Sequence, residues 1–340
     1  MDQGILNLET LWFVLIGVLW TGFFFLEGFD FGVGILLPFI GKKDEDRRVM
    51  INTIGPTWDG NEVWLLTAGG AMFAAFPEWY ATMFSGFYLA LLLILFALIV
   101  RGVAFEYRSK NPTSEWRTMW DWAIFIGSFL PALLFGVAFG NLVRGLQIDA
   151  AGEYVGGFWA LLNPYALVMG ITSLVLFTLH GSLFLSLKAK GVVYDRAVSV
   201  AKPLSIATTV VLALAMIWSY ALSEGGAVPG LLPIVAIALL GAVIWLVRSE
   251  MFGWAFALTG VTIATVMAAI FIATYPNVMT STIDPDYSLT VFNASSSAMT
   301  LKIMSVVALI FVPIVLGYQT WSYWVFRKRI GREDVTTAAH

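Results

Sequence analysis

The chain has 340 residues, of which 59% are hydrophobic and only 12% are charged, whereas an ordinary soluble domain has roughly 25% charged residues. Together with a mean hydropathy of +0.83, this composition excludes a water-soluble fold with a polar surface. The formal net charge of −3 provides no basic patch for nucleic acid. The absence of cysteine excludes disulfides, thiolate catalysis and cysteine-ligated clusters.

Apolar segments of about 20 residues, the length needed to cross a bilayer, recur along the whole chain. We therefore predict an all-α integral membrane protein with about nine transmembrane helices. A single polytopic membrane domain, 1–340, holds helices 1–4 (about 10–143), helices 5–8 (about 160–275) and helix 9 (about 300–326). In chain order the predicted spans are 10–40, 50–76, 80–105, 118–143, 160–187, 198–222, 228–247, 252–275 and 300–326.

Most of the 19 Lys and Arg residues fall in alternate loops and in the C-terminal segment. The loops between them hold no basic residue, except that 144–159 holds Arg144. Because basic loops are retained in the cytoplasm, this alternation predicts an odd number of spans, an outside N-terminus and a cytoplasmic C-terminus. The basic clusters are Lys42, Lys43, Arg47 and Arg48; Arg108, Lys110 and Arg117; Lys188, Lys190 and Arg196; Arg248; and Arg327, Lys328, Arg329 and Arg332.

Ionisable residues inside a span are costly, so they mark candidate functional positions. In the first span Glu27 and Asp30 are three residues apart, which places both carboxyl groups on one helix face. Gly28 and Gly32 form a smooth stripe that favours close helix packing. In a structural reading, the two acids cap a helix or pair with Arg101. In a functional reading, they handle protons or support the cofactor of a partner subunit.

The second span repeats this spacing with Asp59 and Glu62, between Trp58 and Trp64. Two carboxyl groups on one face of an apolar helix could form a proton relay, because burial allows a carboxyl group to bind and release a proton near neutral pH. The alternative is a cluster of acids at the start of a helix, where they complement the helix dipole.

Two further residues, one inside a span and one at the start of a span, are expected to have structural roles. Arg101 lies near the cytoplasmic end of its span, so we expect it to reach the headgroups; the alternative is an ion pair with Glu27, Asp30 or Asp59. Asp121 is expected to anchor the fourth span at the interface.

His180 is the only histidine inside a predicted span, and we expect it to be a hydrogen-bonded packing residue. Haem iron needs His, Met, Cys or Tyr in an organised pocket, and the sequence contains no pair of histidines suited to this. We therefore expect no metal site and no catalytic residue in this chain, and we expect any redox chemistry to lie in a partner subunit.

Several segments, in this order, resemble the second subunit of cytochrome bd quinol oxidases, and the similarity extends from the first predicted span to the last. A single Gly-Phe-Asp match would be weak evidence for this family, whereas the ordered set of segments is highly specific for it. The segments are Glu27–Gly34, Trp58–Trp64, Arg101–Arg108, Trp120–Trp122, Gly136–Asn141, Leu162–Tyr165 and Asn293–Ser297.

The resemblance implies two four-helix bundles with one peripheral helix, paired with a subunit I that carries two b-type haems and one d-type haem. It implies an electrogenic, non-pumping enzyme in the cytoplasmic membrane of a bacterium or archaeon. This enzyme would oxidise quinol and reduce dioxygen to water with cytoplasmic protons. It also implies contacts with lipids, in some members a structural quinone in subunit II, and in some complexes a small accessory membrane subunit.

By the same resemblance, Asp59 matches a proton-path aspartate and Asp30 an acid linked to the integrity of the haem site. Trp64 matches a tryptophan near the point where oxygen enters. Glu27, Glu62, Trp58 and Arg101 belong to the same group of proton-path or haem-supporting candidates, although Gln is common in the family at the position of Glu62.

Two other readings of the sequence remain. A cation-coupled secondary transporter would also place acids inside spans, but transporters tend to show broken helices at matching places in two halves. The in-span prolines of this chain show no such symmetry. A purely structural membrane partner would need no proton-handling acid.

Overall fold

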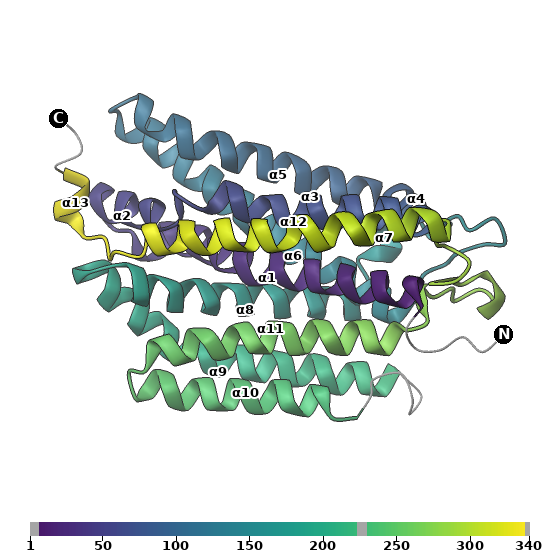
Figure 1. The fold of residues 1–340 in the computed structure, drawn as a ribbon. Coiled ribbons are helices and arrows are strands. Elements are labelled where there is room, and N and C mark those ends of the chain that lie inside the picture. The colour runs from purple at the N-terminus through teal and green to yellow at the C-terminus, as the bar shows by residue number, and fades with distance from the viewer. Residues whose placement is uncertain (1–6, 223–229, 337–340) are drawn as a thin grey trace.

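The computed structural model describes residues 7–222 and 230–336, and the described chain is almost entirely helical (Figure 1). Two short antiparallel strands, β1 (Asn277–Met279) and β2 (Leu289–Thr290), form the only sheet in these residues. The helices are α1 (Leu8–Ile40), α2 (Asp44–Ile54), α3 (Trp58–Ala75), α4 (Pro77–Gly86), α5 (Tyr88–Tyr107), α6 (Ser114–Arg144), α7 (Gly157–Leu161), α8 (Pro164–Lys188), α9 (Gly191–Leu222), α10 (Leu232–Arg248), α11 (Phe252–Thr274), α12 (Ala298–Val325) and α13 (Arg332–Thr336).

Local sequence signals set the first residue of several long helices. The side chains of Asn7, Asn163 and Ser297 each accept a hydrogen bond from the backbone N–H three residues later, at 2.8, 3.0 and 3.2 Å. Such caps satisfy N–H groups that have no partner inside the helix. Pro164 follows its cap at the first helical position, where its fixed φ suits the helix and its missing N–H costs nothing.

The nine predicted spans correspond to nine long helices in the described residues: α1, α3, α5, α6, α8, α9, α10, α11 and α12. Seven of these are long and apolar enough to cross a membrane, namely all except α3 and α10. The all-helical membrane fold is therefore confirmed, while the count of nine spans stays a prediction.

Two of the predicted spans are wrong, because neither is a continuous helix. The predicted span 50–76 is interrupted, because α2 ends at Ile54 and α3 begins only at Trp58. Gly55 still has helical backbone angles, but Pro56 has no N–H to donate to the carbonyl of Asn52 and its ring crowds that carbonyl, which explains the break. The predicted span 80–105 contains a second break at Phe87, where the short helix α4 gives way to α5.

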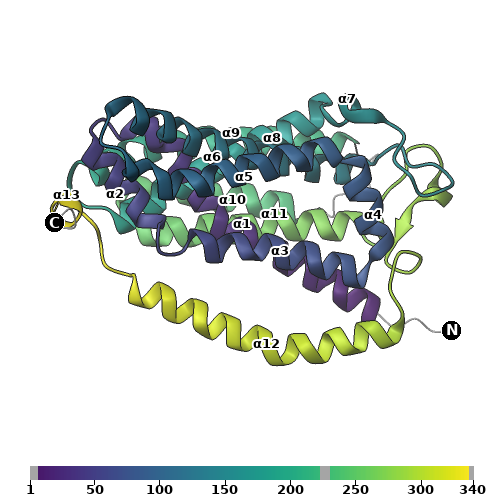
Figure 2. The same ribbon diagram turned by 90° about the horizontal axis from the view of Figure 1, so that it is seen from above.

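The long helices form two groups of four with one helix outside them (Figures 1 and 2). One group contains α1, α3, α5 and α6, and the other contains α8, α9, α10 and α11. Helix α12 touches only α1 and α3 substantially, and Figure 2 shows it along the outside of the first group. This arrangement is the one that the resemblance implied.

The predicted glycine stripe lies where the two groups meet. A Cβ atom on Gly32 of α1 would lie 2.0 Å from the backbone oxygen of Phe177 and 2.8 Å from the Cα of Gly181, both on α8. A real Cβ atom cannot approach backbone that closely, so only glycine allows the two helices to touch here.

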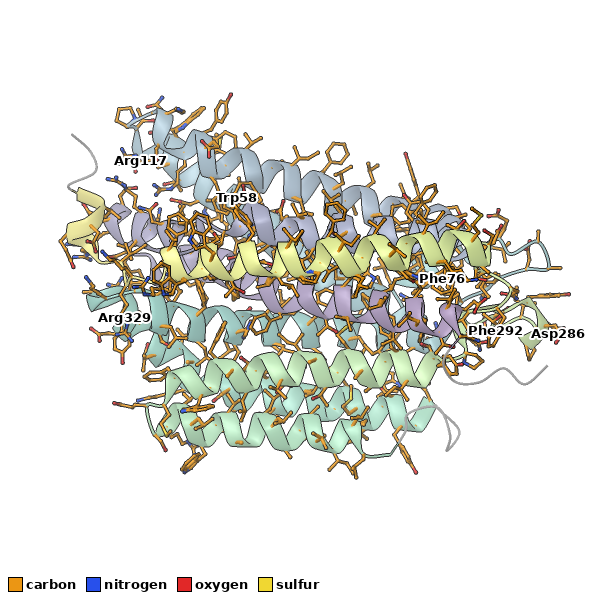
Figure 3. All side chains as sticks on the ribbon, in the orientation of Figure 1. Trp58, Phe76, Arg117, Asp286, Phe292 and Arg329 are labelled. Carbon is orange, nitrogen blue, oxygen red and sulfur yellow. The ribbon has the colours of Figure 1, made fainter. Side chains whose placement is uncertain are left out.

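Charged segments gather at one end of the helices. Figure 3 shows Arg117 and Arg329 at that end, and Asp286 and Phe292 at the other. The described chain begins at the end that carries the strands and finishes with α13 at the basic end (Figure 1). The alternation of basic loops in the sequence thus corresponds to two chemically different ends of the bundle.

Candidate functional site

The candidate site lies inside the first helix group, around the fully buried side chain of Arg101 on α5. Its Nη1 donates to Glu27 of α1 and, at 2.9 Å, to Glu62 of α3. The prediction that Arg101 reaches the headgroups is wrong, and the alternative of an ion pair with Glu27 is confirmed. The reason is that α5 continues to Tyr107, which leaves Arg101 more than one turn inside the helix.

Aromatic rings enclose the guanidinium group. Its carbon atom lies 5.0 Å from the centre of the Phe31 ring and 5.3 Å from that of Phe105. Cation–π contacts of this kind stabilise a charge that has lost its water. They also keep the local dielectric constant low, which strengthens the attraction between Arg101 and its carboxyl partners.

Asp30 belongs to the same buried region but has a different partner. Its Oδ2 accepts a hydrogen bond of 2.7 Å from Nδ2 of Asn61, which is also fully buried. The oxygen of the Asn61 amide in turn accepts from the hydroxyl of Tyr323 at 2.8 Å and from Nε2 of Gln319 at 3.4 Å. Gln319 Oε1 accepts from the indole of Trp64 at 3.0 Å.

Asn61, Gln319 and Tyr323 were missed in the sequence analysis. Asn61 could have been found, since it lies between Asp59 and Glu62 and is polar inside an apolar helix. The signal for Gln319 and Tyr323 is their spacing of four residues, which places two polar side chains on one face of α12.

Several buried polar atoms of the cluster have no hydrogen-bond partner among the described residues. They are Oε2 of Glu27, Oδ1 of Asp30, and Nε and Nη2 of Arg101. An unsatisfied buried polar atom is costly, so each is a position at which a further polar group would bind favourably. Glu62, whose side chain is 22% exposed, connects this interior region to the surface of the chain.

Asp59 lies outside the buried cluster. Its side chain is exposed and accepts a hydrogen bond from the N–H of Gly60 at 2.7 Å. Its charge still acts on Glu62, one turn further along α3. Trp58, beside it, is partly buried and packs its ring against Phe105 at 5.0 Å.

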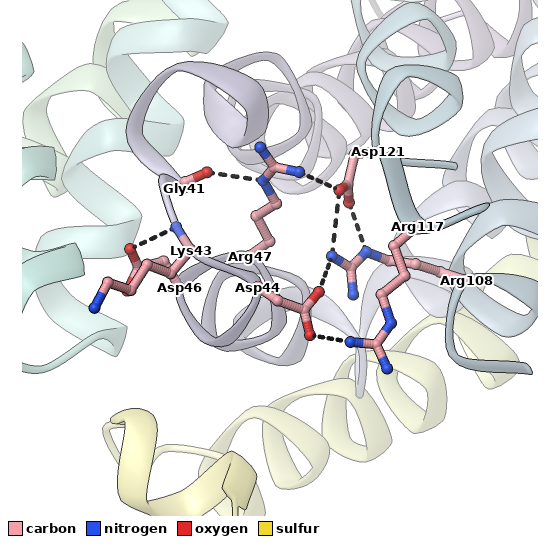
Figure 4. A network of polar contacts seen from close by, with 8 residues as sticks. All are labelled: Gly41, Lys43, Asp44, Asp46, Arg47, Arg108, Arg117 and Asp121. Atoms are coloured by element: carbon pink, nitrogen blue, oxygen red, sulfur yellow. Dashed lines mark hydrogen bonds and ion pairs between the residues drawn. The ribbon is translucent and has the colours of Figure 1, made fainter. Parts of the chain in front are cut away.

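Asp121 lies in the second turn of α6, and its expected role as an interface anchor stays a prediction. It is buried, and it accepts hydrogen bonds from Arg108 at 2.5 Å and from Arg47 at 2.8 Å (Figure 4). Arg108 also pairs with Asp44, which in turn pairs with Arg117, both at 2.7 Å. These residues form a separate ion-pair network at the basic end of the bundle.

His180 is a packing residue, as we expected. Its Nδ1 lies 2.7 Å from the hydroxyl of Thr259, its Nε2 lies 3.1 Å from the backbone oxygen of Phe25, and its ring stacks on Phe256 at 4.3 Å. Both nitrogens are thus engaged. The described residues contain no group of three or more His, Cys, Asp or Glu side chains placed to hold a metal ion.

Comparisons with known proteins agree over nearly the whole chain. A family model described as cytochrome bd terminal oxidase subunit II matches residues 8–326. The cytochrome bd ubiquinol oxidase subunit 2 of Bacillus subtilis is 44% identical over 336 residues, covering 97% of this chain and 99% of the relative. The cytochrome bd-I ubiquinol oxidase subunit 2 of Escherichia coli K12 is 40% identical over 370 residues, covering 98% of each chain.

A solved structure shows the same fold. A chain of the bd oxidase from Geobacillus thermodenitrificans matches with a TM-score of 0.75 at 17% identity, covering 95% of this chain and all of the other. The family match and the two relatives rest on sequence alone, whereas this match rests on structure. The chain therefore belongs to the family of cytochrome bd terminal oxidase subunit II.

Proposed function

We propose that this chain is the haem-free subunit of a quinol:dioxygen oxidoreductase, that it pairs with a haem-bearing subunit I, and that its Arg101 cluster helps to deliver cytoplasmic protons for the reduction of dioxygen to water. The relatives are named as subunits of ubiquinol oxidases, which supports the reaction. In this proposal the complex is electrogenic without pumping, because it takes its protons from one side of the membrane.

One observation carries the proton-handling role: the charges in the interior of the first helix group do not balance. Glu27, Glu62 and Asp30 surround a single guanidinium, that of Arg101. Unpaired charge in an apolar interior is costly, so a cluster with surplus carboxyl groups favours taking up a proton. A purely structural ion pair would not need the additional acids.

The geometry supports a path that begins at the exposed Asp59. A proton taken up there would pass one turn along α3 to Glu62, whose carboxylate shares Arg101 with Glu27. The atoms free to hold a proton in the interior are Oε2 of Glu27 and Oδ1 of Asp30, because both lack a hydrogen-bond partner among the described residues.

The proposed orientation follows from charge. The end of the bundle that carries α2 and α13 holds the basic clusters, so it faces the cytoplasm, and the end that carries the strands faces outward. The acids of α3 then lie on the side from which protons come. Within this proposal the chain is one membrane domain, and Trp64 lies near the point where oxygen enters.

We also propose that the two b-type haems and the d-type haem lie in subunit I, because both ring nitrogens of His180, the only histidine among the described residues, already have partners. An apolar cavity of about 60 Å³ lies between α1, α6, α8, α9 and α11. It is less than half the size of an apolar cavity of about 150 Å³ that holds benzene, so a quinone ring does not fit it.

The test is Asp59→Asn in the purified two-subunit complex. We expect oxygen consumption to fall by about a hundredfold, the effect of removing a proton-transferring group, while the haem absorption spectrum stays unchanged. Asp195→Asn is the matched control, because Asp195 is an exposed acid on α9 at the same end of the bundle, and it should have no effect.

The other readings predict different results. For a purely structural subunit, Asp59→Asn either changes nothing or removes haem and turnover together. If the chain is a cation-coupled transporter, the chain alone, reconstituted in vesicles, transports a solute when a cation gradient is imposed across the vesicle membrane. Either result would overturn the proposal.

A further inference from the structure

Helix α12 makes few contacts with the rest of the chain, yet four hydrogen-bonded groups connect it to the candidate site. Most of its side chains are exposed, and only Leu301 is buried. Gln319 and Tyr323 are exceptions to this exposure, because they are partly buried and point to α3. Thr320, beside them, bonds only to the backbone of its own helix, at Leu316.

The contacts match residue by residue. Gln319 and Tyr323 are one turn apart on α12, and Asn61 and Trp64 are one turn apart on α3. Tyr323 and Gln319 both donate to Oδ1 of Asn61, and Gln319 also accepts from Trp64. The two helices are therefore joined by side chains that are complementary in donors and acceptors.

These donors decide which way the Asn61 amide points. An amide can rotate so that its oxygen and nitrogen exchange places. With Oδ1 held by two donors from α12, the NH₂ group must face Asp30, where it donates at 2.7 Å to Oδ2. In the opposite orientation two oxygen acceptors would face each other, and Asp30 would lose the hydrogen bond from Asn61.

We propose that α12 positions Asp30 through Asn61, with Tyr323 and Gln319 as positioning residues for the buried carboxyl cluster. The peripheral helix α12 thereby orients Asp30 indirectly, because its hydrogen bonds go to Asn61 and Asn61 in turn donates to Asp30. This inference rests on the proposed function of Asp30 in proton delivery. It assigns to α12 a role beyond closing the outside of the helix group.

The test compares two Tyr→Phe changes on the same helix in the purified two-subunit complex. Tyr323→Phe removes the donor to Asn61, whereas Tyr318→Phe removes a hydroxyl from a ring that is 67% exposed. We expect Tyr323→Phe to lower kcat about 2- to 10-fold, the effect of losing one ordinary hydrogen bond, with KM for quinol and the haem spectrum unchanged. Tyr318→Phe should match the parent complex.

A double-mutant cycle shows whether Tyr323 acts through Asn61. Asn61→Ala should lower kcat at least as much as Tyr323→Phe, and the double variant should be no slower than Asn61→Ala alone. Additive losses would overturn the proposed coupling. If Tyr323→Phe does not assemble, Gln319→Leu replaces it in the cycle, with the same expectation.

The failures of the two proposals are distinguishable. If Asp30→Asn lowers kcat but Tyr323→Phe behaves as Tyr318→Phe does, the role of α12 is wrong and the proton-handling role stands. If Asp30→Asn leaves kcat and the haem spectrum unchanged, the function proposed for Asp30 is wrong, and the inference about α12 fails with it.

Discussion

Two groups of ion pairs, both built from arginine and acidic side chains, lie in different regions of the molecule and differ in how completely they are satisfied. Among the ion pairs at the basic end, the arginines outnumber the aspartates, and Asp44, Asp46 and Asp121 each accept from two arginines. In the interior cluster acids outnumber arginines, and atoms of Glu27, Asp30 and Arg101 have no partner among the described residues.

The difference separates structure from function within one chain. A network in which each carboxylate accepts from two arginines is saturated on its acid side, and it holds helix ends together. An unsaturated cluster in an apolar interior is costly to keep, and such residues are typical of functional positions in membrane proteins. The following three changes test whether saturation is the property that distinguishes the two networks.

The largest effect is expected for Arg101→Gln. This change leaves the buried Glu27 and the partly buried Glu62 beside a neutral side chain, and removal of one member of a buried ion pair typically costs about 3–5 kcal/mol in the free energy of unfolding. We expect little assembled complex and a lower thermal unfolding temperature in detergent.

The control for Arg101→Gln is a triple change in which Glu27→Gln and Glu62→Gln accompany it. Because no charge is then stranded, assembly should recover while turnover stays low. If the triple variant were as unstable as Arg101→Gln alone, the surplus of carboxyl groups would not be the cause.

An intermediate effect is expected for Asp46→Asn at the basic end. Asp46 of α2 is buried and accepts from Arg332 at 2.6 Å and from Arg196 at 2.9 Å. Burial alone would raise the pKa of Asp46, but hydrogen bonds from Arg332, the Lys43 backbone and Arg196 lower it below its ordinary value of 3.8. We expect a loss of about 1.5–3 kcal/mol in unfolding free energy near pH 7.

The sign of the pH dependence follows from the lowered pKa of Asp46. The unfolded chain takes up the proton first, so the contribution of Asp46 to stability is complete above pH 3.8 and is lost only as the pH falls through the lower, folded pKa. Thermal unfolding of the parent and of Asp46→Asn should therefore differ equally at pH 7 and pH 5. A difference that already shrinks at pH 5 would contradict this account.

The smallest effect is expected for Lys190→Gln. Lys190 reaches Glu333 at 3.5 Å and Asp334 at 3.7 Å, and all three side chains are about half exposed or more. Exposed pairs of this kind contribute about 0–1 kcal/mol, because water and salt screen them. Thermal unfolding should change little, and a change as large as that of Asp46→Asn would show that exposure does not separate the two cases.

The sequence predicted the helices well and their breaks poorly. Composition alone marks a membrane segment, because apolar length is what a bilayer selects. The break at Phe87 lies within an apolar stretch, so hydropathy does not reveal it. The break at Gly55–Thr57 lies between the polar residues Asn52 and Asp59, where the sequence does carry a signal. The Pro56 signal was present in the sequence, but a span predicted by length alone passes over it.

The site was predicted in part. The spacing of Glu27 and Asp30 placed both on one face, and the structure shows both buried. The same spacing could not tell which acid of α3 faces Arg101, because this depends on the rotation of the helix about its axis. Glu62 makes the ion pair, whereas Asp59 faces outward.

The link to α12 was beyond reach of sequence patterns. Asn61 and Tyr323 are 262 residues apart in the chain, and their hydrogen bond depends on how a peripheral helix packs on the first group. Periodicity within one helix carries no information about such a partner.

The hydrogen bonds of Asp46 have a consequence for biosynthesis. Arg332 belongs to α13, which follows all of the long helices in chain order, whereas Asp46 belongs to α2, directly after the first. Because a protein is made from its N-terminus, Asp46 emerges from the ribosome long before this arginine does. A chain cut short before α13 by premature termination of translation would therefore lack one of the two arginines that pair with Asp46, and only Arg196 would remain as its ion-pair partner.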